Sequence, residues 1–142
     1  MQLVVDFRFC AAHRLPRHPG RCHRLHGHSY RLQVVVTGRP DGRSGMVVDF
    51  YDVVGAVQPV IDALDGTCLN EALLNPTAEA IVVLLWRRIA PDLPQLNELR
   101  LWETDDCQVV YCGEPVPAEL IAEGSAVSHP STAPTDESAP AL

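Results

Sequence analysis

The spacing of hydrophobic residues changes twice along this chain, and this change most restricts the folds it can adopt. Near both ends apolar and polar residues alternate, as on the two faces of half-buried strands. In the middle, apolar residues recur at the spacing of one helix face. The strand-like segments are 3–10, 27–36, 99–103 and 107–111, and the helix-like segments are 50–64 and 78–89. The predicted order is therefore ββααββ, which is typical of α+β domains.

Capping residues and turns set the ends of these segments. Asp49 is the expected N-cap of the first helix, and Asp65-Gly66 is expected to end it. Asn75 is the expected N-cap of the second helix, with Pro76 in its first turn. The last two strand-like segments are separated only by residues 104–106, which predicts a hairpin.

Length and composition indicate one folded domain with an appendage. A chain of 142 residues with 46% hydrophobic residues has the size of a single globular core. Residues 1–114 are the predicted domain. Residues 115–142, rich in Pro, Ala, Ser and Glu, are predicted to be a disordered tail, with a short helix near 118–123 as the alternative. The first residues do not resemble a signal peptide, because the charged Asp6 comes early, and no apolar run has membrane-spanning length. We therefore expect a cytoplasmic protein without a membrane partner.

Charge and cysteine content argue against several classes of protein. Of the net charge of −7, residues 113–142 carry −5 from five acids, which leaves −2 for residues 1–112. A nearly neutral domain without lysine gives no reason to expect a nucleic-acid partner. Four arginines between positions 14 and 24 suit a phosphorylated small molecule, or they form an ordinary solvated loop. The five scattered cysteines lack a Cys-x-x-Cys pair, which argues against a disulfide scaffold.

Three histidines are spaced so that they can share one metal ion. His26 and His28 lie two apart on a predicted strand, so both project from the same face of the sheet. His13 ends the neighbouring predicted strand and can bring a third ring nitrogen alongside. Three neutral imidazoles suit Zn²⁺ and leave one coordination position open for water or substrate. The alternative is a His-Gly-His turn with surface histidines. The histidines outside the predicted site are His18, His23 and His129.

Two further side chains have surroundings that suggest chemistry. Cys22 is close in sequence to the predicted metal site, where a zinc ion would help to stabilise its thiolate. Glu103 continues the row of Leu99 and Leu101 on one strand face, where a carboxylate is costly unless it is paired. A guanidine-like edge of a ligand would be such a partner. If Glu103 instead faces water beside the turn, it needs none.

Several short motifs occur in an order that resembles a known family. They are Ala11-Ala12-His13-Arg14-Leu15, Cys22-x-x-x-His26-Gly27-His28, Val47-Val48-Asp49-Phe50, Leu64-Asp65 with Leu69-Asn70, Asn75-Pro76-Thr77-Ala78-Glu79, and Glu103-Thr104 with Tyr111-x-Gly113-Glu114. Over about residues 7–114 the chain resembles the 6-pyruvoyltetrahydropterin synthase and 6-carboxytetrahydropterin synthase family of the tunnelling fold. The three-residue spacer between Cys22 and His26 resembles the bacterial 6-carboxytetrahydropterin synthases, which start 7-deazapurine and queuosine synthesis.

The resemblance implies a fold, a reaction and a set of site residues. The fold is a four-stranded antiparallel sheet with two helices on one face, whose barrel is completed in a homo-oligomer, a trimer or hexamer with active sites at subunit boundaries. The reaction is that of a zinc-dependent lyase, converting 7,8-dihydroneopterin triphosphate to 6-carboxy-5,6,7,8-tetrahydropterin with release of acetaldehyde and triphosphate. The implied residues are His13, His26 and His28 for zinc, Cys22 and Asp65 for catalysis, and Glu103, Thr77 and Glu79 for the pterin.

Gly66 departs from the family pattern. The family has histidine after the position of Asp65, where it completes a Cys-Asp-His relay, and glycine cannot transfer a proton. Losing a general acid or base typically costs roughly 100- to 10,000-fold in rate. Two alternatives therefore stay open: a related pterin synthase or aldolase with another product, and a non-catalytic pterin-binding paralogue. His18 or His23 could replace the missing group if a loop or a neighbouring subunit brings it close.

Overall fold

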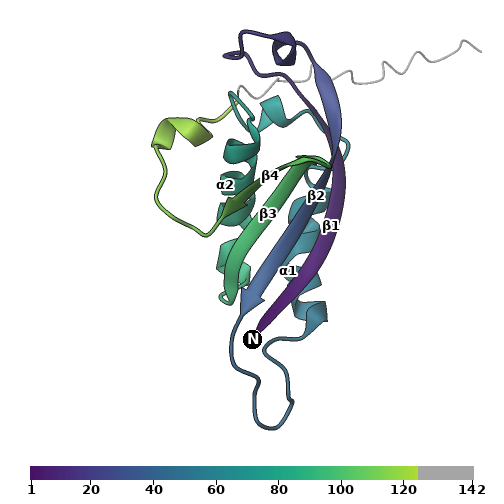
Figure 1. Cartoon of the computed structure of the whole chain (residues 1–142), viewed down its shortest axis with the longest axis vertical. Coiled ribbons are helices and arrows are strands. Elements are labelled where there is room, and N and C mark those ends of the chain that lie inside the picture. Colours follow the sequence, from purple (N-terminus) through teal and green to yellow (C-terminus); the bar gives the residue numbers. More distant parts are fainter. Residues whose placement is uncertain (125–142) are drawn as a thin grey trace, which may run out of the picture.

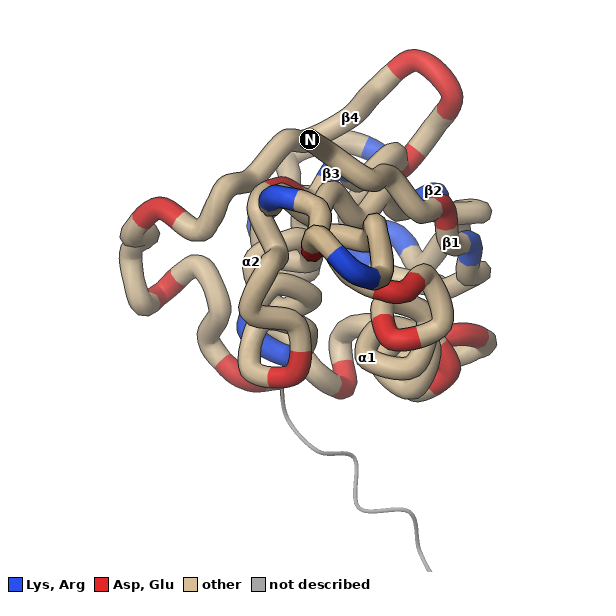
Figure 2. The backbone as a smooth tube through the Cα atoms, turned by 90° about the horizontal axis from the view of Figure 1, so that it is seen from below, with Lys and Arg blue, Asp and Glu red and all other residues tan. Residues whose placement is uncertain are grey.

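The computed structural model describes residues 1–124, and within them four strands form one antiparallel sheet in the order β1-β2-β3-β4 (Figure 1). The strands are β1 (Gln2–His13), β2 (His26–Thr37), β3 (Leu96–Thr104) and β4 (Cys107–Tyr111). Two helices, α1 (Phe50–Asp62) and α2 (Ala78–Ile89), lie side by side on one face of the sheet (Figure 2). The predicted ββααββ order and the sheet with two helices on one face are confirmed.

The helix starts follow from their capping side chains. Asp49 caps α1 as predicted, because its carboxylate accepts the N–H of Tyr51 at 2.9 Å. The prediction for α2 was wrong, since the cap is Thr77, whose hydroxyl accepts the N–H of Ala80 at 3.2 Å, and not Asn75. The Pro76 carbonyl instead binds the ring of His13, and the side-chain oxygen of Asn75 accepts the N–H of Arg17 at 3.5 Å.

The core lies between the sheet and the two helices. Because side chains alternate along a strand, each strand turns one row of residues toward α1 and α2. These rows are apolar and buried along most of their length, with Phe9 and Tyr30 stacked at 4.9 Å between ring centroids. At one end of the sheet, however, these rows finish in polar residues, which are His13 on β1, His26 and His28 on β2, and Glu103 on β3.

The segment after β4 returns to the domain. Residues 118–121 form a short 3-10 helix, η4 (Ala118–Ile121), as the alternative prediction had it, and Leu120 and Ile121 pack against the core. The N–H of Leu74 donates to the Ala122 carbonyl at 2.9 Å. The first ten residues of the predicted tail, 115–124, thus include contacts with the domain. Residues 125–142 lie outside the described part, and their disorder stays a prediction. Among residues 1–124 no helix is both long and apolar enough to span a membrane.

Candidate metal centre

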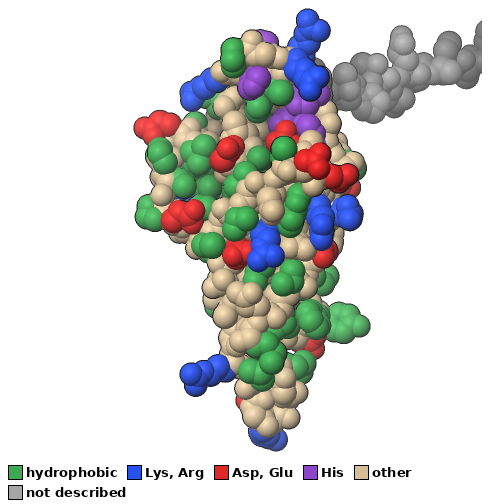
Figure 3. Space-filling view, viewed as in Figure 1, with side chains coloured by type: hydrophobic (Ala, Val, Ile, Leu, Met, Phe, Trp, Pro, Cys, Tyr) green, Lys and Arg blue, Asp and Glu red, His purple; other side chains and the backbone are tan. Residues whose placement is uncertain are grey.

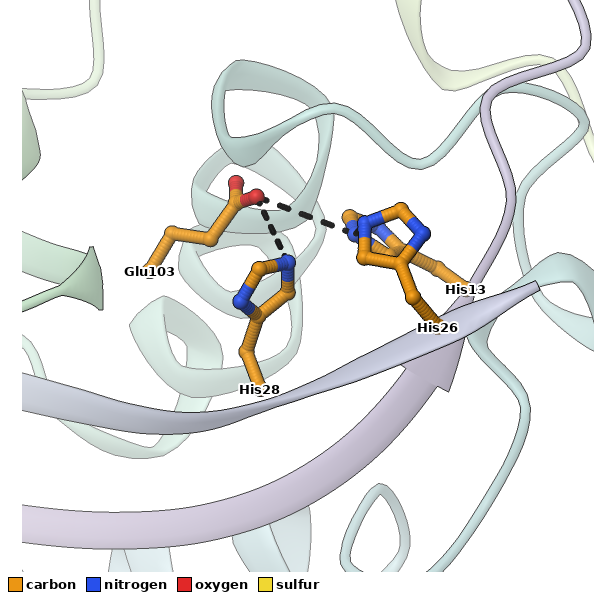
Figure 4. A group of neighbouring side chains, drawn as sticks. All are labelled: His13, His26, His28 and Glu103. Carbon is orange, nitrogen blue, oxygen red and sulfur yellow. Dashed lines mark hydrogen bonds and ion pairs between the residues drawn. The ribbon is translucent and has the colours of Figure 1, made fainter. Parts of the chain in front are cut away.

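The three predicted histidines meet at the end of the sheet together with Glu103 (Figure 4). His13 is the last residue of β1 and His26 the first of β2, and the strand register places them directly opposite each other. His28 follows two residues later on the same face, and Glu103 comes from the end of β3. One ligand atom from each of the four side chains lies within 4.8 Å of the others. Strand pairing and alternation alone therefore converge three imidazoles and one carboxylate.

Backbone carbonyls fix the orientation of two rings. His13 is fully buried, and its Nδ1 donates to the Pro76 carbonyl at 2.8 Å, while the Nδ1 of His26 donates to the Arg24 carbonyl at 2.7 Å. In neutral rings bonded in this way, each Nε2 keeps its lone pair. The two Nε2 atoms are only 3.1 Å apart. Burial lowers the pKa of His13, which favours its neutral form.

His28 has a polar atom that the surrounding protein does not satisfy. Its Nε2 is buried and has no hydrogen-bond partner within residues 1–124. The Glu103 Oε1 is 2.9 Å away, but it lies outside hydrogen-bonding geometry. A buried polar group left without a partner costs about 1–3 kcal/mol. Together with the two facing Nε2 atoms of His13 and His26, this nitrogen fits a cation bound by imidazoles, and Zn²⁺ prefers such donors.

Glu103 lies against the histidine rings and does not face only water. Its Oε1 lies 2.9 Å from the Nε2 of His28 and 3.7 Å from that of His13, and its side chain is 24% exposed. The carboxylate predicted to need a partner thus contacts the imidazoles in this structure. Glu103 is also placed where it could be a fourth metal ligand, because one of its carboxylate oxygens lies within 4.8 Å of a ring nitrogen of each histidine.

Sequence reasoning missed three contributors to this site. The carbonyls of Pro76 and Arg24 orient the rings, and no sequence signal marks a backbone oxygen. Tyr30 is fully buried, with its hydroxyl 3.5 Å from the Nδ1 of His13. Burial, and then the charge of Glu103, raises the pKa of Tyr30, so it stays neutral. Tyr30 could have been found, because it follows His28 by two residues on the same strand face.

The predicted catalytic residues lie outside this four-residue cluster. Cys22 is half-buried in the short 3-10 helix η1 (Arg21–His23), and its carbonyl accepts the N–H of Leu15 at 2.9 Å. Asp65 is exposed beside the outer edge of β1, where its Oδ1 accepts the N–H of Cys10 at 2.8 Å. Within one subunit, the histidines and Glu103 are therefore assembled, but the predicted Cys22 and Asp65 are not part of the same cluster.

The two predicted pterin-lining residues begin α2. Thr77 is half-buried and caps the helix, and Glu79 is exposed in its first turn. Thr77 directly follows Pro76, whose carbonyl binds His13, so the start of α2 adjoins the metal centre. The sequence motif that suggested a pterin pocket therefore also has a structural role, since it caps a helix and orients the ring of His13.

Gly66 occupies a turn that favours glycine. Its φ is +71°, in the left-handed region, and its N–H donates to the Cys10 carbonyl at 2.7 Å. A Cβ added there would have no atom within 4 Å. A larger residue at position 66 therefore has room, but its backbone would be strained.

Comparison with known proteins identifies the family to which this chain belongs. Residues 2–114 match the family of 6-pyruvoyl tetrahydropterin synthase, and the chain belongs to that family. The 6-carboxy-5,6,7,8-tetrahydropterin synthase of Synechocystis is 36% identical over 110 residues, which cover 72% of this chain and 85% of that protein.

Two other proteins bear on the function and the fold. The dihydroneopterin monophosphate aldolase of Pyrococcus furiosus is 39% identical over 85 residues, covering 58% of this chain and 73% of that protein. The structure of 6-pyruvoyl tetrahydropterin synthase from Caenorhabditis elegans superposes with a TM-score of 0.75 at 23% identity, covering 80% of this chain and 96% of that chain. This superposition confirms the tunnelling fold.

Proposed function

We propose that this protein is a zinc-dependent lyase that, with water, converts 7,8-dihydroneopterin triphosphate to 6-carboxy-5,6,7,8-tetrahydropterin, acetaldehyde and triphosphate. The observation that carries the proposal is the convergence of the Nε2 atoms of His13, His26 and His28 beside a carboxylate. Membership of the family supports the pterin substrate, and the name of the Synechocystis relative supports the carboxy product. The protein would then serve 7-deazapurine and queuosine synthesis, as expected from the spacer after Cys22.

In this proposal the three histidines bind the metal, and backbone contacts orient two of their rings. Bound zinc would supply a Lewis acid that polarises the oxygens of the substrate side chain. The Pro76 and Arg24 carbonyls keep the Nδ1 atoms of His13 and His26 occupied, so that each Nε2 faces the centre. Burial of His13 keeps its ring neutral, which ligation requires.

The remaining residues bind the pterin and move protons. Glu103 would accept hydrogen bonds from the amino-pyrimidinone edge of the pterin, for which its ionised carboxylate is suited. Thr77 and Glu79 would line the same pocket from the start of α2. Cys22 would remove and return the proton at the carbon next to the developing carbonyl, with Asp65 assisting.

We propose further that copies of this chain complete the site. Cys22 and Asp65 are not in the cluster within one subunit, and the sheet has two edge strands, β1 and β4. Within residues 1–124 the outer edge of β1 is bonded only near its end, at Cys10 and Ala12. Exposed edges favour pairing with other chains. Size-exclusion chromatography with light scattering should give a trimer or hexamer, and a stable monomer would contradict the proposal.

The aldolase relative supports a second candidate. Because a dihydroneopterin monophosphate aldolase is 39% identical over 85 residues, side-chain cleavage of a related pterin to a different product is the main competitor. A non-catalytic pterin binder is the third candidate, because Gly66 stands where the family has the relay histidine.

One experiment separates the three candidates. Zinc-loaded protein is incubated with 7,8-dihydroneopterin triphosphate, and the products are identified by mass analysis, with Cys22→Ala as the matched variant. Acetaldehyde and the 6-carboxy product from wild type, reduced roughly 100-fold or more in Cys22→Ala, are expected. Another pterin product would favour the aldolase-like reaction. Binding by calorimetry without any product would favour the non-catalytic binder.

A further inference from the structure

The loop between β1 and β2, residues 14–25, concentrates positive charge, and we call it the basic loop. It holds Arg14, Arg17, Arg21 and Arg24 and no Asp or Glu, although the whole chain carries −7. All four arginines are exposed, and none forms an ion pair within residues 1–124. Several unpaired charges of one sign in a short loop raise the local potential and attract an anion.

Part of the basic loop surrounds a hollow of about 710 Å³. Arg21 and Arg24 line it together with His18 and His23, and no acidic residue lines it. Figure 3 shows arginine (blue) and histidine (purple) together at the end of the molecule that carries this loop. Guanidinium groups present paired N–H donors that match phosphate oxygens, so the lining suits a phosphate better than a small neutral ligand.

The backbone of the basic loop is already fixed. The N–H of Leu15 donates to the Cys22 carbonyl at 2.9 Å, and the N–H of Gly20 donates to the Nδ1 of His18 at 2.9 Å. The side chain of Asn70 bonds both the N–H and the carbonyl of Arg14, each at 2.9 Å, which ties the loop to the domain. A loop that is ordered before binding loses less entropy when the ligand arrives.

Each end of the basic loop is joined directly to a residue of the metal centre. It leaves β1 at His13 and enters β2 at His26, which are paired in the strand register. The Arg24 carbonyl accepts the Nδ1–H of His26 at 2.7 Å, so the arginine that lines the hollow also orients a metal ligand. The hollow and the metal centre are therefore connected through Arg24, which lines the hollow and whose carbonyl binds the ring of His26.

We infer that the basic loop binds the phosphate chain of the substrate, with Arg21 and Arg24 as its main contacts. The inference rests on the proposed function for the identity of the ligand, a pterin that carries a linear triphosphate. The chemical class it recognises is a linear polyphosphate, and the two guanidinium groups determine specificity for phosphorylated over unphosphorylated pterins.

Inorganic tripolyphosphate, titrated calorimetrically into metal-free protein, tests this inference without requiring turnover. The variants are Arg21→Gln/Arg24→Gln and a control, Arg39→Gln/Arg43→Gln, which removes the same charge from exposed positions between β2 and α1. Wild type and the control should bind tripolyphosphate with the same affinity. Arg21→Gln/Arg24→Gln should bind it more than about tenfold more weakly, because losing each exposed charge weakens binding about three- to fivefold and the two effects multiply. Equal weakening in both variants, or no tripolyphosphate binding by wild type, would overturn the inference.

Kinetics separate this inference from the proposed function. If the lyase activity exists and the loop binds phosphate, Arg21→Gln/Arg24→Gln should raise KM at least about tenfold while its melting temperature stays that of wild type. An active protein with unchanged KM in that variant would refute the role of the loop and leave the function standing. Tripolyphosphate binding by a protein that forms no product would refute the function and leave the anion site standing.

Discussion

His13 and His26 face each other across the last residue pair of the β1–β2 register, with their Nε2 atoms 3.1 Å apart and both Nδ1 atoms bonded to backbone carbonyls. Neither Nε2 carries a proton in the neutral rings, so two lone pairs point to one region. That arrangement is unfavourable unless a proton or a cation is shared. A divalent cation satisfies both nitrogens at once, and the unsatisfied Nε2 of His28 lies in the same cluster.

Zinc is therefore expected to bind the protein and to stabilise it. At a free concentration of 100 times Kd, a ligand that binds only the folded state adds about 2.7 kcal/mol to the free energy of unfolding. The measurement is zinc titration against a competing chelator, with thermal melting in parallel. His28→Ala should lose both the affinity and the melting shift, whereas His18→Ala, outside the cluster, should keep them. Wild type that takes up no metal would refute the site.

Replacing Glu103 separates a pterin anchor from a fourth metal ligand. Glu103→Gln is expected to leave zinc affinity nearly unchanged and to weaken pterin binding about 10- to 100-fold, because charge-assisted hydrogen bonds contribute about 1.5–3 kcal/mol. Zinc titration and pterin calorimetry measure the two effects. Asp105→Asn is the control, since it removes one charge from an exposed turn position two residues away. A large loss of zinc affinity in Glu103→Gln alone would make Glu103 a ligand.

Substitution at Gly66 tests whether the missing relay histidine limits turnover. Gly66→His should raise the rate by about 10- to 100-fold, because it restores a group able to transfer protons. Since φ is +71°, Gly66→His and Gly66→Ala should each lower the free energy of unfolding by about 1 kcal/mol. Urea unfolding and product analysis check both effects. Equal rates in Gly66→His and Gly66→Ala would mean that another group already transfers the proton.

The stability of the metal-free protein should depend on pH through His13. Burial lowers its pKa in the folded state below the ordinary value of about 6.5. Below about pH 6.5 the His13 ring binds a proton more readily in the unfolded chain than in the folded protein, and this protonation favours unfolding. The stability that depends on neutral His13 is therefore complete above that pH and is lost as pH falls toward the folded pKa. The slope reaches at most about 1.4 kcal/mol per pH unit.

Urea unfolding in chelator between about pH 5 and pH 8 measures this dependence. In His13→Gln the slope below about pH 6.5 should be smaller than in wild type, whatever the absolute stability of the variant. An unchanged slope in that variant would show that other groups are responsible.

The sequence by itself determined the order of the elements and the face on which the site residues lie. Alternation with period two puts His26, His28 and Tyr30 on one face of any strand that contains them, and helical spacing marks α1 and α2. These properties depend only on local backbone geometry, which is why they could be predicted. The family motifs likewise depend on residue order, and the match over residues 2–114 confirmed the family that they indicated.

Only the tertiary structure decided how the rings are oriented and what Glu103 contacts. The Pro76 and Arg24 carbonyls determine which ring nitrogen of His13 and of His26 faces the metal centre. Every residue has a backbone carbonyl, so no pattern of side chains reveals which carbonyls do this. The same holds for the start of α2, where the cap is Thr77 and not the predicted Asn75, whose side chain accepts the N–H of Arg17 in the loop after β1. Contacts between segments far apart in the chain depend on register and packing, which local spacing does not contain.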